Sequence, residues 1–136
     1  YENRVLEDAE FENDTVDAGE IGASQTITAL YQVVPRSIPS GSFGKLEFRY
    51  KIPGQDQSRL LTHSLNNNRN EFAASSENMR FAASLAGFGM LLKNSEYSGD
   101  AGYEQVKEWA GNARSYDPFG FREEYIELID RVKNLD

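Results

Sequence analysis

The sequence contains no cysteine. This absence excludes disulfide bonds, metal sites built from thiolates and a cysteine nucleophile. It leaves the redox compartment open, because a chain without cysteine is compatible with the cytoplasm and the periplasm alike. The sequence also has a single histidine, His63, so a metal site with several histidine ligands is excluded as well.

Long apolar runs are missing too. The sequence holds no stretch of about 18 apolar residues and no signal-peptide core, so we expect no direct insertion into a membrane. The chain begins at Tyr1 rather than at methionine. We therefore expect residues 1–136 to be a piece of a longer protein, whose targeting signals would lie upstream of Tyr1.

Clusters of lysine and arginine are absent, and acidic residues outnumber basic ones. The formal net charge is -8, and residues 1–20 hold eight acidic residues against Arg4 alone. An acidic chain repels phosphate backbones and anionic lipids. We expect neither nucleic acid nor an anionic membrane surface among its partners.

The composition that is present is typical of a globular protein. Hydrophobic residues make up 39% of the chain and aromatic residues 12%, and a chain of this length buries about two thirds of its unfolded surface. We predict a single domain over residues 1–136. Its acidic lead-in and β-rich part cover residues 1–66, its helical part covers residues 67–136, and the polar stretch "NNNRN" marks the joint.

Three segments alternate with a period of two residues and predict strands. The first covers residues 26–34, where one face carries Ile27, Ala29, Tyr31 and Val33. The second covers residues 45–52, where the face that we expect to be buried carries Leu46, Phe48, Tyr50 and Ile52, and the solvated face carries Lys45, Glu47, Arg49 and Lys51. The third, "RLLTHSL", follows the turn "PGQDQS" and predicts an antiparallel hairpin with the second.

After residue 70 the apolar period becomes helical and predicts three helices. The first is capped by Ser75 or Ser76, contains small residues that allow close approach, and carries the stripe Phe81, Leu85, Phe88 and Leu92. The second starts near Asp100 and aligns Tyr103, Val106, Ala110 and Ala113. The third starts with Asp117 as N-cap and Pro118 in its first turn, and aligns Phe121, Tyr125, Leu128, Val132 and Leu135.

These elements predict an α+β fold. A small antiparallel sheet of about three strands comes first, and about three α-helices packed on it follow.

The stretch "DTVDAGEIG" gives three weak candidates for metal ligands, Asp14, Asp17 and Glu20. An EF-hand loop starting at Glu10 fails, because Thr15 occupies the glycine position and Ile21 the final glutamate position. An irregular calcium cage built from Asp14, Asp17 and backbone carbonyls remains open. The alternative is a solvated acidic turn, which is the commoner use of such a stretch.

His63 lies in the third predicted strand, with Leu61 and Leu65 on the same face. It could act as a general base toward Ser58, Ser64 or a loop serine, but the chain has no nucleophile-elbow motif. We expect instead a partly buried, hydrogen-bonded strand histidine.

Two further patterns suggest chemistry and are better explained by structure. Glu123 and Glu124 fall in a first helical turn, where carboxylates favour the helix dipole, rather than forming a glycosidase pair. Trp109 has helical spacing with apolar neighbours and favours a core position over a carbohydrate or peptide platform. No residue predicts a catalytic site or a cofactor, and we expect no enzyme.

Three stretches carry a family resemblance. They are "YENRVLEDAEFENDTVDAGEIGASQTITALYQVVP", "RFAASLAGFGMLLKNSEYSG" and "YDPFGFREEYIELI". In this order and spacing they resemble the C-terminal region of bacterial proteins with a von Willebrand factor type A domain, the YfbK-type family. The likeness covers essentially the whole chain, and the chain departs from the family pattern at Ser24, Gln25 and Gln32.

The resemblance implies an upstream type A domain as the first partner of this chain. It also implies an extracytoplasmic protein of the bacterial periplasm or cell surface, with a lipid anchor upstream as one option. The metal-binding motif Asp-x-Ser-x-Ser belongs to the type A domain and does not occur in this chain. We therefore expect a non-catalytic accessory module that supports protein-protein interaction or adhesion; the alternative is a calcium-stabilised ligand-binding module that uses the N-terminal acids.

Overall fold

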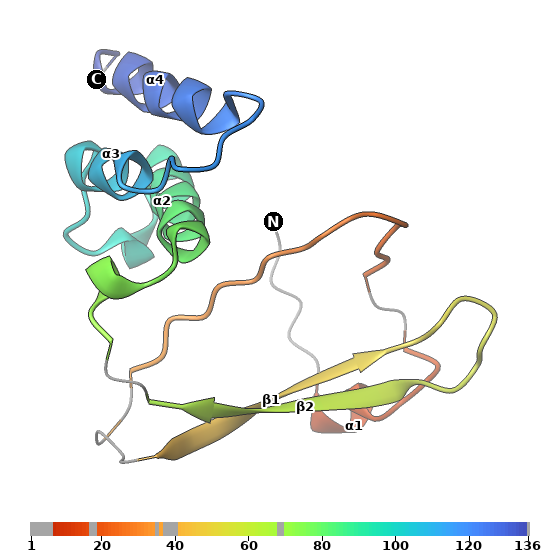
Figure 1. The fold of residues 1–136 in the computed structure, drawn as a ribbon. Coiled ribbons are helices and arrows are strands. Elements are labelled where there is room, and N and C mark those ends of the chain that lie inside the picture. Colours follow the sequence, from red (N-terminus) through yellow and green to blue (C-terminus); the bar gives the residue numbers. More distant parts are fainter. Residues whose placement is uncertain (1–6, 17–18, 35, 37–40, 68–69, 136) are drawn as a thin grey trace. The chain divides into compact units, whose positions relative to one another are not determined.

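The computed structural model of the protein describes residues 7–16, 19–34, 36, 41–67 and 70–135 (Figure 1). The chain divides into two compact units. We call them the hairpin unit, Tyr1–Ile27 with Val34–Arg69, and the helical unit, Thr28–Val33 with Asn70–Asp136. Each is described by itself, and the packing of the helices on the sheet stays a prediction.

The hairpin unit is built on strands β1 (Ser42–Tyr50) and β2 (Arg59–Asn66), which pair antiparallel. Leu46 lies opposite His63 and Phe48 lies opposite Leu61, with an irregularity in register between Ser42 and Gly44. The backbone N–H of Gln55 donates to the carbonyl of Ile52 over 2.9 Å and helps to close the connecting turn. The predicted hairpin is confirmed. The short helix α1 (Asp8–Phe11) precedes it.

The predicted strand over residues 26–34 is wrong. In the structure these residues form no strand, and they also lie outside every helix and turn. The α+β class holds, but the sheet has two strands among the described residues rather than three. The alternation of Ile27, Ala29, Tyr31 and Val33 records how side chains would project from a strand. A strand also needs hydrogen bonds to a neighbouring strand, and an alternating pattern does not show whether such a neighbour exists.

The helical unit contains α2 (Glu77–Leu92), α3 (Tyr103–Gly111) and α4 (Phe121–Lys133). Single 3₁₀ turns at Phe72–Ala74 and Glu96–Ser98 flank α2. The predicted cap of the first helix is confirmed at Ser76, whose Oγ accepts from the N–H of Met79 over 3.2 Å. Among the described residues, no helix has the length and apolar character needed to cross a membrane.

The start of α4 differs from the prediction. The N-cap is Gly120, in a left-handed conformation with φ of 74°, rather than Asp117. Asp117 still provides hydrogen-bond acceptors for the first turn of α4. Its Oδ2 accepts from the backbone N–H groups of Arg122 and Glu123 over 3.0 and 3.1 Å. The residues between Asp117 and Gly120 form a turn, closed by a hydrogen bond from the Gly120 N–H to the Asp117 carbonyl over 3.2 Å. Gly120 tolerates the positive φ that this turn requires.

The core of the helical unit lies where α2, α3 and α4 meet. It is the cluster of Phe88, Val106, Ala110, Tyr125, Ile126 and Ile129. A Cβ added to Gly87 would lie 3.1 Å from Cγ2 of Val106, so the predicted close approach of another element to α2 is confirmed. At the centre, the Ser84 hydroxyl donates to the Val106 carbonyl over 2.7 Å and lies 3.0 Å from the Tyr125 hydroxyl.

Two of the predicted apolar stripes are rotated relative to the observed core. On α2, Leu85 and Leu92 are exposed, and the contact is made through Ser84, Gly87 and Phe88. In α4 and just after it, the exposed residues include three that we expected to be buried, namely Phe121, Leu128 and Leu135. The predicted stripe of α3 is confirmed at Val106, Ala110 and Ala113, which are fully buried. The prediction placed the buried face of each helix from its large apolar residues. The buried face of α2 also depends on small residues, which this method ignores.

Candidate functional site

One face of the hairpin is apolar and open to solvent. Residues opposite each other in an antiparallel pair project to the same side, so one side gathers side chains from both strands. We call this side the apolar hairpin face and define it by Leu46, Phe48, Tyr50, Leu61 and His63; Arg59, opposite Tyr50, borders it at one end. Leu61 is 54% exposed and Phe48 is 51% exposed. An exposed apolar cluster of this kind is typical of an interaction surface.

The opposite face of the hairpin is polar and partly covered. The guanidinium of Arg49 donates to Ser58 Oγ over 2.9 Å and lies 5.5 Å from the ring centre of Phe11 in α1. Glu47, also half-buried, accepts from Lys45 over 2.6 Å. The prediction that the apolar side of this strand is buried and the charged side is solvated is therefore wrong. Alternation shows that the two sides differ, but not which side the N-terminal segment covers.

Asp14 attaches the N-terminal segment to the hairpin. Its carboxylate accepts from the backbone N–H of Ser58 over 3.3 Å, and its backbone carbonyl accepts from the Lys51 ammonium. The hydrogen bonds from Ser58 hold the pKa of the Asp14 carboxyl below its usual value; slight desolvation opposes this, and the charges of Lys51 and Arg49 add to it. This residue therefore has a structural role in joining two segments of the hairpin unit.

The structure describes two of the three candidate metal ligands, Asp14 and Glu20. Asp14 faces Ser58, Glu20 is exposed, and Asp17 lies outside the described residues. Within the part of the chain that the structure describes, no group of three or more His, Asp or Glu side chains could hold a metal ion. The calcium hypothesis stays a prediction.

His63 is exposed on the apolar hairpin face, so the expectation of a partly buried histidine is wrong. Ser64, its neighbour along the strand, projects from the opposite side because successive strand residues alternate. Ser58 is engaged with Arg49 and Asp14. The structure therefore does not assemble a histidine-serine pair from these residues.

The remaining candidates have structural partners. Glu123 forms an ion pair with Arg114 over 2.6 Å in the first turn of α4, where Glu124 also lies. The Trp109 ring packs edge-on against Phe72, with 5.1 Å between ring centres. Trp109 is half-buried in the helical unit, as expected for a packing residue.

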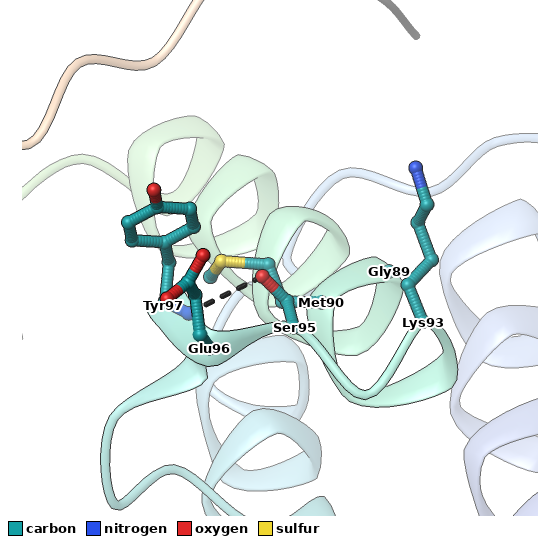
Figure 2. Close-up of a pocket in the computed structure, with 6 residues that line it drawn as sticks. All are labelled: Gly89, Met90, Lys93, Ser95, Glu96 and Tyr97. Atoms are coloured by element: carbon teal, nitrogen blue, oxygen red, sulfur yellow. Dashed lines mark hydrogen bonds between the residues drawn. The ribbon is translucent and has the colours of Figure 1, made fainter.

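A hollow of about 380 Å³ lies at the end of α2 and is lined by Gly89, Met90, Lys93, Ser95, Glu96 and Tyr97. Figure 2 shows the Lys93 side chain extending away from the side chains of Glu96 and Tyr97. Ser95 Oγ is occupied in accepting from the Tyr97 N–H over 3.3 Å. Small-molecule sites usually have a few polar groups that converge on one point, and the polar groups of this hollow do not.

Sequence reasoning missed the exposure of the apolar hairpin face. It also missed an aromatic pair beside α4, where the exposed rings of Phe119 and Phe121 lie 5.8 Å apart between centres. The signal that could have found the hairpin face is the pattern itself. A strand pair with one apolar side needs a cover, and the alternating pattern itself does not say which segment provides it.

Comparison with known proteins places the chain beside one family. The family model described as "Uncharacterized protein YfbK, C-terminal" matches residues 1–48 and 38–135. The protein "Uncharacterized protein YfbK" of Escherichia coli (strain K12) is 36% identical over 149 residues, which cover 96% of this chain and 25% of the relative. The chain thus spans about a quarter of the length of that relative. No solved structure matches.

Proposed function

Because the chain belongs to the family of the YfbK C-terminal region, we propose that it is a non-catalytic interaction module that docks on another domain of a longer polypeptide. That domain is the von Willebrand factor type A domain implied by the sequence resemblance. The module would act in a protein of the bacterial periplasm or cell surface and support its protein-protein interactions or adhesion.

The observation that carries this proposal is the apolar hairpin face. A two-stranded sheet is marginally stable by itself in water and gains stability when its apolar side is covered. Phe48 and Leu61 each keep about half of their surface exposed, so burying either one against a partner is worth about 1 kcal/mol. The length of the relative supports a partner within the same polypeptide, because three quarters of the relative lies beyond the matched region.

The test is calorimetric titration of residues 1–136 with the separately expressed type A domain, in magnesium and in chelator. Two neighbouring leucines give a matched pair of variants, because Leu61 and Leu60 are 54% and 49% exposed and project to opposite sides of the hairpin. We expect Leu61→Thr to weaken binding about fivefold, since 1 kcal/mol corresponds to roughly that factor. We expect Leu60→Thr to leave the affinity nearly unchanged.

Two outcomes contradict the proposal. One is no binding when both proteins are folded. The other is an equal loss of affinity in Leu60→Thr and Leu61→Thr, because the contact would then not depend on the apolar hairpin face.

A further inference from the structure

One stretch of the sequence lacks any charge. Residues 21–35, "IGASQTITALYQVVP", contain no Asp, Glu, Lys or Arg, although these residues make up 26% of the whole sequence. The strand β1 is different, because it carries charged side chains at Lys45, Glu47 and Arg49. Natural proteins place charges on strands that would otherwise pair with other chains. The uncharged stretch carries no such protection.

The described part of this stretch is exposed and unpaired. Tyr31 is 80% exposed and Val34 is 85% exposed, and Ile27 and Val33 are each more than half exposed. Within the described chain, no backbone hydrogen bond joins residues 26–34 to a strand. None of these residues has the positive φ of a turn. Their backbone N–H and C=O groups are therefore free to form a ladder with a sheet from outside this chain.

The side chains indicate which kind of sheet would accept this segment. As a strand it would project Ile27, Ala29, Tyr31 and Val33 to one side, and Thr28, Leu30, Gln32 and Val34 to the other. Both sides are uncharged and mostly apolar, which is typical of strands in sheets that helices cover on both faces. A second copy of this chain would offer the edge of its hairpin, whose polar side carries Lys45, Glu47 and Arg49.

We propose that residues 26–34 add as a β-strand to the open edge of a helix-covered sheet in the neighbouring domain of the same polypeptide. This proposal rests on the proposed function and names a second contact beside the apolar hairpin face. Main-chain hydrogen bonds provide the affinity in such strand addition, and alternate side chains provide the specificity. The length of the relative outside the matched region leaves ample chain for such a domain.

The test exploits the period of strand pairing. In an edge strand, alternate N–H groups point toward the neighbouring strand and the others point away. Proline lacks the N–H and is tolerated only where that group would face solvent. Residues 28–31 are therefore replaced one at a time by proline, and separately by alanine where the residue is not already alanine. Each variant of residues 1–136 is titrated with the type A domain.

We expect two of the four proline variants, at alternate positions, to lose at least tenfold in affinity relative to their alanine partners. The other two should stay within about threefold. Hydrogen exchange gives a second measurement, because alternate amides of residues 26–34 should slow when the domain is added. Since these residues are exposed, the circular dichroism and melting temperature of the unbound variants should not change.

The outcomes separate this proposal from the proposed function. Binding that depends on Leu61 but shows no alternation among the proline variants overturns the strand pairing alone. Amide protection of residues 26–34 could instead rise with the concentration of residues 1–136 in the absence of the domain. The segment would then pair with a second copy of the chain, which overturns the proposal. Absence of binding by the unsubstituted chain overturns both.

Discussion

Ser84 joins the three helices at the scale of a single residue. It is fully buried in α2, donates to a carbonyl of α3 and contacts the hydroxyl of Tyr125 in α4. Burial raises the pKa of the Tyr125 hydroxyl, and the Ser84 hydrogen bond partly offsets this effect. The Tyr125 hydroxyl therefore stays protonated at neutral pH and depends on Ser84 for a partner.

We predict that Ser84→Ala lowers the free energy of unfolding of the helical unit by about 1–3 kcal/mol, because it leaves the buried Tyr125 hydroxyl without this hydrogen bond. Tyr125→Phe should cost less, since Ser84 keeps its bond to the Val106 carbonyl. The double variant should lose less than the sum of the two single variants. Chemical denaturation monitored by circular dichroism measures all three, and strict additivity would contradict the coupling.

Elements of secondary structure differ in how far the sequence predicts them. The hairpin and the cap of α2 follow from local signals, namely alternation around a turn and a serine before a helical stripe. The sequence predicts Asp117 as the N-cap of α4, but Gly120 takes that position in a left-handed conformation, and Asp117 only accepts hydrogen bonds from the first turn. The segment 26–34 has strand character, but no strand partner is found for it in the described part of the chain. Local patterns predict an element, but pairing and coverage depend on residues far away in the sequence.

At the candidate site, the sequence pattern does not predict which side of the hairpin is covered. The alternation of residues 45–52 shows which residues share a face, and the structure confirms that grouping. The cover comes from Phe11 and Asp14, more than thirty positions earlier, through a cation-π contact and hydrogen bonds. No periodicity within the strand could have predicted contacts of that kind.

The attachment of the N-terminal segment to the hairpin should depend on pH. The folded-state pKa of Asp14 is lowered from its ordinary value of 3.8, so the stability from this group is present above that value and is lost as the pH falls through the lower, folded-state pKa. We predict that Asp14→Asn removes this acid transition in the hairpin unit. Glu12→Gln is the matched control, because Glu12 is an exposed acid on the same segment. Amide chemical shifts of Ser58 between pH 2 and pH 6 would measure the change, and identical titrations in both variants would contradict the assignment.

At the scale of the whole molecule, the two units differ in how they are stabilised. The buried residues of the described chain all lie between Ser84 and Ile129, within the helical unit. The hairpin unit is held by its ladder and by polar contacts at its surface. Regions with few buried apolar contacts open at low free-energy cost.

We predict that limited proteolysis of residues 1–136 cuts first before residue 70 and leaves a fragment that contains α2, α3 and α4. Mass spectrometry identifies the fragments, and circular dichroism shows whether the remaining one stays helical. Adding the type A domain should slow the early cuts, because the proposed contacts involve residues 26–34 and the apolar hairpin face. First cuts within α2 or α4 would contradict this order of stability.

The position of the core also bears on how the chain is made. Synthesis proceeds from the N-terminus, so the uncharged residues 21–35 leave the ribosome long before Ile129, without which the core of the helical unit is incomplete. During that interval an exposed, β-prone and uncharged segment is available to other nascent chains. The proposed partner domain lies upstream and is synthesised first, so we expect it to be available to cover this segment as soon as the segment emerges.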